Sequence, residues 1–407
     1  MSQAPASRAA AWLMQPLRLR EVTLRNRVAI SPMCTYAAAV GMANDFHLVH
    51  LGRFAIGGAG LVFVEVTAVQ AEGRTSHGDL GLWNDGQVAP LARVAGFLRE
   101  QGATPGIQIG HAGRRASAQR PFQGGGPIGE RDIARGEPPW QTISASAVPF
   151  GPGWMPPRAM TLSDLAQLRR DFAAAAERAG RAGFQLLEIH AAHGYLLHSF
   201  LSPHPNRRRD AYGGGLANRM RLLLEVIEAV RERWPSSLPL SVRISSVDDL
   251  EGGWSIEDSV TLAHEMKRRG VDLVDCSSGG IAGSPTASTV PRDYGFQLPY
   301  AERVRRDAAI ATIAVGLIVD PRQAEAALQA GQADLIAIAR QALQEPNWAL
   351  QAAVALGTDA PPAQRFDSWP ECFGWWLARR AVVLERLGSW QAPSAQPGHD
   401  SGTPGSD

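Results

Sequence analysis

Eight short apolar segments recur along the chain, each bounded by residues that favour turns. Most of them are apolar nearly throughout and do not alternate with polar residues, which is typical of strands covered on both faces. The expected strands cover residues 27–31, 60–66, 104–109, 184–190, 238–244, 271–277, 311–316 and 333–339.

Amphipathic stretches between these segments predict helices. The stretch SDLAQLRRDFAAAAERAG begins at Ser163, which is a candidate N-cap. Leu165, Leu168 and Phe172 then fall on one face of the helix. Strands that alternate with helices indicate βαβ units and a parallel sheet. Eight such units in one chain predict an α/β fold of the TIM (β/α)8 barrel type.

Two further segments add to this barrel. The alternating stretch LRLREVTLRNR, from Leu17, predicts an N-terminal hairpin that closes the bottom of the barrel. Residues 111–160 are rich in Gly, Pro, Ser and Arg, and predict a long insertion after strand 3. The expected organisation is an N-terminal extension (1–16), one barrel domain (17–390) and a tail (391–407) that is disordered because it has little apolar surface to bury.

A doubly wound dinucleotide-binding fold is the competing α/β architecture. It requires a G-x-G-x-x-G motif directly after a strand and at the start of a helix. The pattern occurs at Gly124, Gly126 and Gly129, inside the insertion, with Pro127 in its middle and no helical pattern after it. The match therefore has the wrong context, and the barrel is the preferred fold.

Charge and cysteine content narrow the class of partner and the compartment. Lys and Arg total 40 and Asp and Glu total 39 among 407 residues, a net charge of +1, so we expect a small-molecule partner and neither nucleic acid nor a membrane. Cys34, Cys276 and Cys372 are widely spaced, which argues against a disulfide framework or an iron–sulfur cluster. No apolar run is long enough to span a bilayer, and the expected location is cytoplasmic.

The chain contains a single lysine, Lys267, in a stretch with helical periodicity and charged neighbours. Schiff-base chemistry requires a lysine inside a site. A solvated helical position makes that class of enzyme a poor match.

Polar residues at the C-terminal ends of barrel strands are the default catalytic candidates. The rule collects mostly neutral hydrogen-bond donors and two arginines, with few carboxylates. The set is Ser31, Pro32, Met33, Cys34, Tyr36, Gln108, His111, His190, His193, Tyr195, Arg243, Ser277, Gly279, Gly280, Gly316 and Arg340.

Each of the two candidate arginines, Arg243 and Arg340, has two interpretations. Arg340 and the Gly316 turn coincide with the phosphate site common in this fold, although Arg340 also suits an ion pair at the rim. Arg243 lies in an apolar strand and needs a polar or anionic partner. That partner is either Glu188 or Asp275 in a structural bridge, or an electron-rich cofactor.

His190, His193 and Tyr195 lie within six residues of each other. One interpretation is a metal site, but no third ligand is evident at the strand ends. A second interpretation has no site at all: one histidine is packed in the core and the other is exposed. The third is a site in which the imidazoles polarise a carbonyl or nitro oxygen and Tyr195 donates a proton. Cys34, just past the first strand, is either an inert buried thiol or part of this site.

Six motifs lie in order on these strands: LRNRVAISPMCTY, GAGLVFVEVTAV, GIQIGHAGR, EIHAAHGYLLHSFLSPHPNRRRDAYGG, SVRISS and AIARQAL. Together they resemble the old yellow enzyme family of flavin-dependent ene-reductases, in particular its thermophilic-like branch, which includes the xenobiotic reductases. The resemblance covers residues 17–348 and is more specific than any single motif.

The resemblance implies a barrel that carries non-covalent FMN, which NADPH or NADH reduces and an activated alkene reoxidises. The residues implied around the flavin ring are Pro32, Met33, Cys34, Val66, Gln108, His190 and Arg243. Those implied at the ribityl chain and phosphate are Gly316, Ala339 and Arg340.

For the substrate, the resemblance implies that His190 and His193 bind the oxygen of an α,β-unsaturated carbonyl or nitro compound. Tyr195 would protonate Cα while flavin N5 delivers hydride to Cβ. Tyr36 would line the substrate pocket, and Cys34 would tune the flavin.

The chain departs from the family pattern at several positions. Val66 stands where the family usually has alanine, and Phe296 where relatives often have tyrosine in the pocket. Members of this branch often insert a C-terminal aromatic residue and an arginine into a neighbouring subunit, which implies a homodimer or homotetramer. Trp375 or Trp376 with Arg379 would fill that role, unless the segment only forms an amphipathic closing helix.

Overall fold

The structure is a computed structural model that describes residues 11–282, 292–357, 361 and 364–391. The chain divides into two compact units, Met1–Leu356 and Gly357–Asp407. The barrel unit thus ends at Leu356, whereas the sequence placed the limit of the barrel domain at 390. The predicted disordered tail, 391–407, lies outside the described residues except for Gln391.

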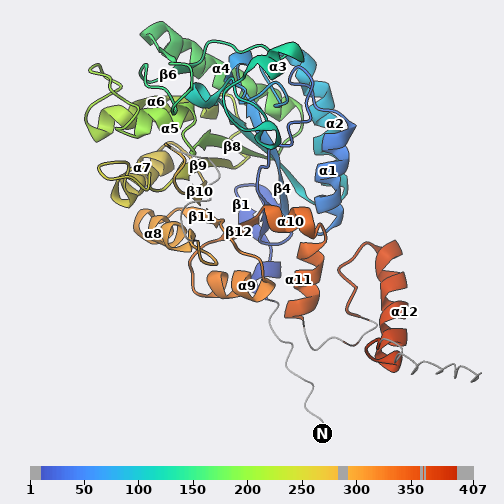
Figure 1. The fold of residues 1–407 in the computed structure, drawn as a ribbon. Helices are drawn as coiled ribbons and strands as arrows, with labels where there is room; N and C mark the ends of the chain where they lie inside the picture. Colours follow the sequence, from blue (N-terminus) through green and yellow to red (C-terminus); the bar gives the residue numbers. More distant parts are fainter. Residues whose placement is uncertain (1–10, 283–291, 358–360, 362–363, 392–407) are drawn as a thin grey trace, which may run out of the picture. The chain divides into compact units, whose positions relative to one another are not determined.

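Eight parallel strands form a closed barrel, which confirms the predicted TIM barrel (Figure 1). Each strand lies within or overlaps one of the eight predicted apolar segments. In barrel order they are β3 (Val28–Ile30), β4 (Leu61–Ala68), β5 (Thr104–Gly110), β8 (Leu186–Ala191), β9 (Leu240–Ser245), β10 (Leu273–Ser277), β11 (Ala311–Ala314) and β12 (Leu335–Ile338).

Helices connect successive strands and surround the barrel (Figure 1). They are α1 (Asp45–Ile56), α2 (Val88–Glu100), α4 (Leu162–Arg181), α6 (Leu216–Arg231), α7 (Ile256–Arg268), α8 (Leu298–Ala308) and α9 (Pro321–Gln329), with α10 (Arg340–Gln344) and α11 (Trp348–Leu356) after the last strand. Short 3-10 helices cover Trp12–Met14, Ala71–Gly73, Asp85–Gln87, Gly113–Arg115 and Pro121–Gln123. Lys267 is exposed on α7, as predicted.

The start of α4 differs from the prediction. The Thr161 side chain accepts from the Asp164 N–H, and the Asp164 carboxylate accepts from the Thr161 N–H, so Thr161 is the N-cap and the assignment to Ser163 was wrong. Both residues suit an N-cap, but a carboxylate three residues after Thr161 completes a capping box there. The predicted apolar face is confirmed, since Leu165 and Phe172 are fully buried.

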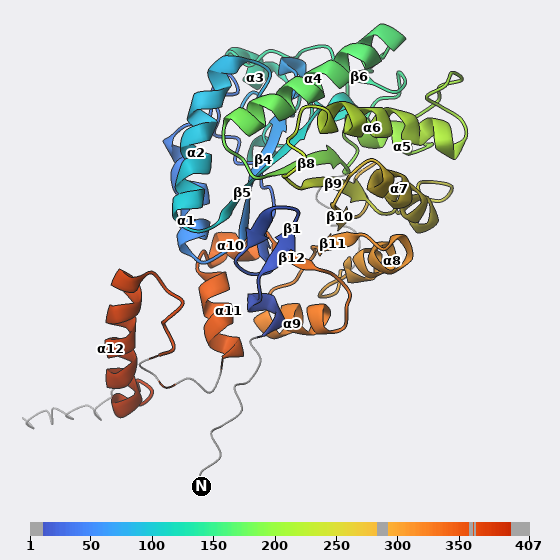
Figure 2. The same ribbon diagram turned by 180° about the vertical axis from the view of Figure 1, so that it is seen from behind.

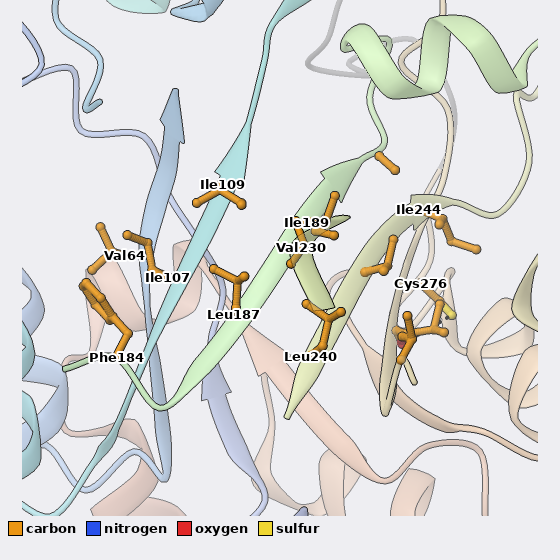
Figure 3. Close-up of a cluster of buried hydrophobic side chains, with 14 of the residues drawn as sticks. Val64, Ile107, Ile109, Phe184, Leu187, Ile189, Val230, Leu240, Ile244 and Cys276 are labelled. Atoms are coloured by element: carbon orange, nitrogen blue, oxygen red, sulfur yellow. Dashed lines mark hydrogen bonds between the residues drawn. The ribbon is translucent and has the colours of Figure 1, made fainter. Parts of the chain in front are cut away.

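The outer face of the barrel wall packs against the helices. On β8, Leu187 and Ile189 belong to the large cluster of buried side chains that includes Val230 of α6. Figure 3 shows them beside Ile107 and Ile109 of the neighbouring strand β5. Because side chains on a strand alternate, the residues between them face into the barrel.

The N-terminal hairpin is formed by β1 (Leu17–Leu19) and β2 (Val22–Leu24), which pair antiparallel as predicted (Figure 2). Its apolar side chains Leu19, Val22 and Leu24 share a separate buried cluster with residues of the barrel strands and one that follows β11. These residues are Ala29, Leu61, Phe63, Leu186, Leu273, Ile313, Val315, Leu335 and Ala337. The hairpin therefore closes the N-terminal end of the barrel with apolar side chains, which leaves the polar residues at the other end.

The predicted insertion follows β5, the third strand of the barrel. It contains α3 (Glu130–Ala134) and two short parallel strands, β6 (Ile143–Ser144) and β7 (Arg158–Ala159). The Ser144 hydroxyl donates to that of Ser199 in α5 (Leu196–Leu201), which directly follows the His190–Tyr195 segment. The insertion thus packs beside the segment that carries the candidate site.

In the second unit the described helix is α12 (Glu371–Leu387). Trp375 and Trp376 are exposed, and the Arg379 guanidinium carbon lies 3.4 Å from the Trp375 ring centroid. Their insertion into a neighbouring subunit stays a prediction.

Candidate functional site

Inward-facing residues change from apolar to polar along the barrel strands. On β8 the order is Leu186, Glu188 and His190, and all three are at most 5 % exposed. The polar layer at the C-terminal end also contains Gln108 of β5 and Arg243 of β9. Its position is the one that TIM-barrel enzymes use for their active sites.

Arg243 is paired inside this layer. Its Nε lies 3.4 Å from Asp275 Oδ2, and Nε and Nη2 donate to the Ser277 hydroxyl at 3.1 and 2.9 Å. Neither Asp275 oxygen has a hydrogen-bond partner within the described part of the chain. Burial raises the pKa of Asp275, and the Arg243 cation opposes that rise. The sequence offered Glu188 or Asp275 as the partner of Arg243 in a structural ion pair, and the structure has the pair with Asp275. This ion pair is compatible with a cofactor bound against Arg243.

Glu188 has no solvent exposure. It lies two residues before His190 on β8, and therefore deeper in the barrel than Arg243, which pairs with His190. It accepts from Gln108 Nε2 at 2.9 Å and from the Ser241 hydroxyl at 2.8 Å. Burial and the nearby Asp275 raise the pKa of Glu188 to about 8, although Arg243 lowers it in part. Burial therefore favours the protonated form of Glu188 over a wider pH range than in a solvent-exposed glutamate.

Glu188→Gln should reduce the loss of stability as the pH rises from 5 to 8. The unfolded-state pKa of a glutamate is about 4.3, so between that value and about 8 the folded state holds a proton that the unfolded state releases. Stability from this group is complete at low pH and is lost as the pH rises, by up to about 1.4 kcal/mol per pH unit. Urea unfolding at pH 5 and pH 8 should show a smaller decline in the variant than in the wild type. Equal declines would contradict the raised pKa.

The end of β8 and the turn that follows it bring His190, His193 and Tyr195 together. The His190 and Tyr195 rings stack with centroids 4.5 Å apart and an interplanar angle of 20°. His193 Nδ1 lies 3.3 Å from His190 Nε2, so one of these nitrogens donates to the other. His193 is partly exposed, while His190 and Tyr195 are 5 and 8 % exposed.

Both imidazoles are neutral at physiological pH. Burial and the Arg243 cation hold the pKa of His190 and that of His193 well below their usual value. Within the described residues, no group of three or more His, Cys, Asp or Glu side chains is arranged to hold a metal ion. The pair is thus suited to donate a neutral hydrogen bond to a substrate oxygen.

The turn that carries these residues has a strained backbone. His193 has φ +56°, which is uncommon for a residue with a side chain, and Gly194 has φ +74°. A Cβ at Gly194 would lie 2.3 Å from the Gly280 carbonyl oxygen, and one at Gly280 would lie 2.8 Å from His193 Cα. The two glycines therefore allow the loops after β8 and β10 to touch, which fixes the position of His193.

A buried histidine and aspartate support this turn, and sequence reasoning missed both. His198 Nδ1 accepts from the Gly194 N–H at 2.9 Å, and its Nε2 donates to Asp248 Oδ1 at 2.8 Å. Asp248 Oδ2 also accepts from the Ser202 hydroxyl at 2.6 Å. Both side chains are fully buried. The spacing of His198 within the HAAHGYLLH motif was the available signal, but its partner lies 50 residues further along.

Arg115, in the insertion, is a second residue that sequence reasoning missed. It is 7 % exposed, donates to the His193 carbonyl oxygen, and places its guanidinium carbon 5.3 Å from the Tyr195 ring centroid and 4.8 Å from that of Phe150. Its position directly after the GHAGR motif was the only feature of the sequence that indicated a role in the site. Thr75, which contacts the Tyr195 hydroxyl, had no such feature.

Val66 and Tyr195 belong to one small apolar cluster, and Cys34 packs against it. A register shift between Val64 and Thr67 marks a bulge in β4, and bulges re-aim side chains beside active sites. Burial, with Asp79 and Glu65 nearby, raises the pKa of the Cys34 thiol well above its usual value. The thiol is therefore protonated and is not a nucleophile in this setting.

The neighbouring loop residues 31–36 are fixed by a buried carboxylate. Glu65 Oε2 accepts from the Thr35 N–H at 2.9 Å, and burial raises the pKa of Glu65 to about 8. Tyr36 has φ +57° and packs edge-to-face with Phe122 of the insertion. Met33 packs on the core and Pro32 is partly exposed.

Cations gather on the side of the barrel mouth formed by β11 and β12. Arg340 is exposed at the start of α10, and its charge, after burial, contributes to lowering the pKa of Arg292. The Arg292 guanidinium carbon lies 4.7 Å from the Phe296 ring centroid. Gly316 has φ +116°, and a Cβ there would lie 2.9 Å from Phe296 Cε1. Two cations that repel each other beside a glycine turn suit a phosphate group.

The residues present fit FMN. The Ser31 hydroxyl is buried at the end of β3 with no partner among the described residues, and it suits a hydrogen bond to a polar ring edge. Arg243 supplies a fixed positive charge at the mouth, while Arg292 and Arg340 provide the cations that a phosphate requires. Phe296, expected in the substrate pocket, contacts the Gly316 turn on the phosphate side.

Two negative findings concern the described residues. No helix among them is long and apolar enough to cross a membrane. All three cysteines lie in this part of the chain, and none forms a disulfide.

Comparisons with known proteins agree with this geometry. The model of the NADH:flavin oxidoreductase / NADH oxidase family matches residues 12–358. NADPH dehydrogenase from Listeria innocua is 43 % identical over 360 residues, which is 88 % of this chain and 99 % of that protein.

Solved structures show the same fold. Morphinone reductase aligns with a TM-score of 0.70 at 26 % identity, covering 86 % of this chain and 91 % of that one. The old yellow enzyme homologue from Zymomonas mobilis aligns with a TM-score of 0.68 at 23 % identity, covering 89 % of this chain and 98 % of that one.

Proposed function

The chain belongs to the NADH:flavin oxidoreductase / NADH oxidase family, and from this premise we propose that it is an FMN-dependent NADPH dehydrogenase that reduces activated C=C bonds. The proposed substrates are α,β-unsaturated carbonyl or nitro compounds. One observation carries the substrate class: two neutral imidazoles and a tyrosine hydroxyl, on one strained turn, lie at the mouth of the barrel.

When bound, FMN would supply the hydride that the β-carbon of the alkene accepts. Arg243 offers a positive charge that stabilises an electron-rich ring, with Pro32, Met33, Cys34, Val66, Gln108 and His190 as the other ring contacts. Gly316, Ala339 and Arg340 would hold the ribityl chain and phosphate.

His190 and His193 bind the electron-withdrawing oxygen of the substrate. Because both are neutral, each carries one N–H, and the contact between His190 Nε2 and His193 Nδ1 uses one of the two. A bound oxygen replaces this contact, so that both N–H groups draw electron density from the β-carbon and stabilise enolate-like charge on the oxygen. Tyr195 then protonates Cα. Its ring is held against His190, so the binding and protonating groups keep a fixed separation. Tyr36 lines the pocket with its rigid loop.

Purification and turnover test this function. We expect a yellow protein that retains FMN, consumes NADPH and converts cyclohexenone to the saturated ketone under anaerobic conditions. Parallel assays with NADH determine the preferred reductant. A colourless protein that takes up no FMN on reconstitution would overturn the proposal, and metal analysis of it would test the metal-dependent alternative.

Cys34→Ser should shift the reduction potential of the bound flavin and leave FMN retention unchanged. The Cys34 thiol is neutral, so serine preserves charge and approximate shape but replaces a polarisable sulfur with a stronger hydrogen-bonding group. The potential is measured by equilibration with a reference dye. A potential equal to that of the wild type would leave Cys34 with a packing role alone.

We also propose a cytoplasmic homodimer or homotetramer. The three free thiols agree with a reducing compartment, and the exposed aromatic residues of α12 are the candidate subunit contacts.

A further inference from the structure

The Tyr195 hydroxyl makes a hydrogen bond that neither the motifs nor the family comparison assigns. Its oxygen lies 2.9 Å from Oγ1 of Thr75. Thr75 is 120 residues away in the sequence, in the loop between β4 and α2. Either oxygen can be the donor.

Both backbone groups of Thr75 are fixed. Its N–H donates to Asp79 Oδ2 at 2.8 Å, and its carbonyl oxygen accepts from the Ala118 N–H at 2.8 Å. Asp79 is 2 % exposed and also accepts from the N–H and hydroxyl of Ser76, at 3.1 and 2.6 Å. A loop built around one buried carboxylate thus holds the Thr75 hydroxyl in place.

The Tyr195 ring is fixed equally well. His190 stacks on it, and the Arg115 guanidinium carbon lies 5.3 Å from its centroid. The contact between the two hydroxyls therefore does not depend on a mobile side chain.

The direction of this hydrogen bond matters for proton transfer. Tyr195 delivers its proton to Cα only when its O–H points at the substrate, and its oxygen is then free to accept from the Thr75 hydroxyl. Burial raises the pKa of Tyr195, as do Cys34 and Asp79, while Arg115 and the Thr75 hydrogen bond lower it. Thr75 thus opposes the cost of a buried phenolate.

We propose that Thr75 is a positioning residue for the proton transfer, whose hydroxyl donates to the Tyr195 oxygen, aims the phenol proton at Cα and stabilises the oxygen as the proton leaves. The role rests on the proposed function. In this step the Tyr195 O–H bond breaks and a Cα–H bond forms, while the hydride on Cβ brings both electrons. Water returns a proton to Tyr195 afterwards.

Thr75→Val removes the hydroxyl at nearly constant shape, and Thr75→Ser keeps it. For the FMN-loaded enzyme, we expect Thr75→Val to slow cyclohexenone reduction about ten- to a hundredfold, the loss that one hydrogen bond to a charged group predicts. Reduction by NADPH and turnover with ferricyanide, which takes electrons and no proton, should not change. Thr75→Ser should retain most of the cyclohexenone rate, and the solvent isotope effect should rise only in Thr75→Val.

Two further sets of variants distinguish a positioning role of Thr75 from a general effect of substitution on folding. Thr261→Val removes an exposed threonine hydroxyl on α7 and should change none of these rates. If Thr75→Val does not fold, Thr75→Ser and Thr75→Ala form a second pair that differs by the hydroxyl alone.

Three outcomes would overturn the role of Thr75: a wild-type enone rate in Thr75→Val, an equal loss with ferricyanide, or no difference between serine and alanine. A wild-type enzyme that turns over ferricyanide but leaves enones unchanged would instead overturn the proposed function, and the role of Thr75 with it.

Discussion

Tyr195→Phe should slow alkene reduction by about 10²–10⁴-fold, the usual contribution of a positioned general acid. Phenylalanine keeps the ring that stacks on His190 at 4.5 Å and removes only the hydroxyl that contacts Thr75. Reduction of the bound flavin by NADPH requires no proton from Tyr195, so its rate should stay near that of the wild type. Stopped-flow measurement of the two half-reactions checks both expectations.

Tyr212→Phe is a matched control. The Tyr212 hydroxyl hydrogen-bonds Glu225 of α6 at 3.0 Å, and Glu225 also pairs with Arg169 of α4. Its loss should leave both half-reactions unchanged. If Tyr195→Phe slowed flavin reduction and alkene reduction equally, Tyr195 would shape the site and would not be the proton donor.

Tyr195 was predictable because its evidence is local. The strand 184–190 ends in a histidine, and the next residues carry the remaining donors, so one segment and one fold rule place them together. The barrel itself was predictable for a similar reason: each strand is covered on both faces, and its apolar run stands out from its flanks.

The parts that escaped prediction depend on contacts between distant segments. Thr75 lies in a loop and Arg115 ends a short 3-10 helix, and the course of both segments follows from packing. Neither residue type is unusual in such a segment. The bridge between Arg243 and Asp275 was one of two possibilities, because Glu188 and Asp275 both face inward and sequence alone does not give their depth. The predicted N-cap of α4 was wrong for a local reason. Thr161 and Ser163 are both suitable N-cap residues, but only Thr161 has a carboxylate three residues later, at Asp164.

Arg243→Met should destabilise the protein by about 3–5 kcal/mol, the usual cost of breaking a buried ion pair. Asp275 is 1 % exposed and its carboxylate has no hydrogen bond among the described residues, so Arg243, at 3.4 Å, is what offsets its burial. The variant should also lose FMN, because a methionine offers no charge to the flavin ring. Urea unfolding and the fluorescence of released FMN measure the two effects separately.

A second substitution separates the ion pair from the cofactor role. Arg243→Met combined with Asp275→Asn removes the unpaired charge and should recover part of the stability, but FMN retention should stay low. Arg231→Met breaks a pair with Asp272 at 3.0 Å, near the starts of β9 and β10, and should lower stability without loss of FMN. If the double variant bound FMN as tightly as the wild type, Arg243 would serve only to neutralise Asp275, and the flavin would not require its charge.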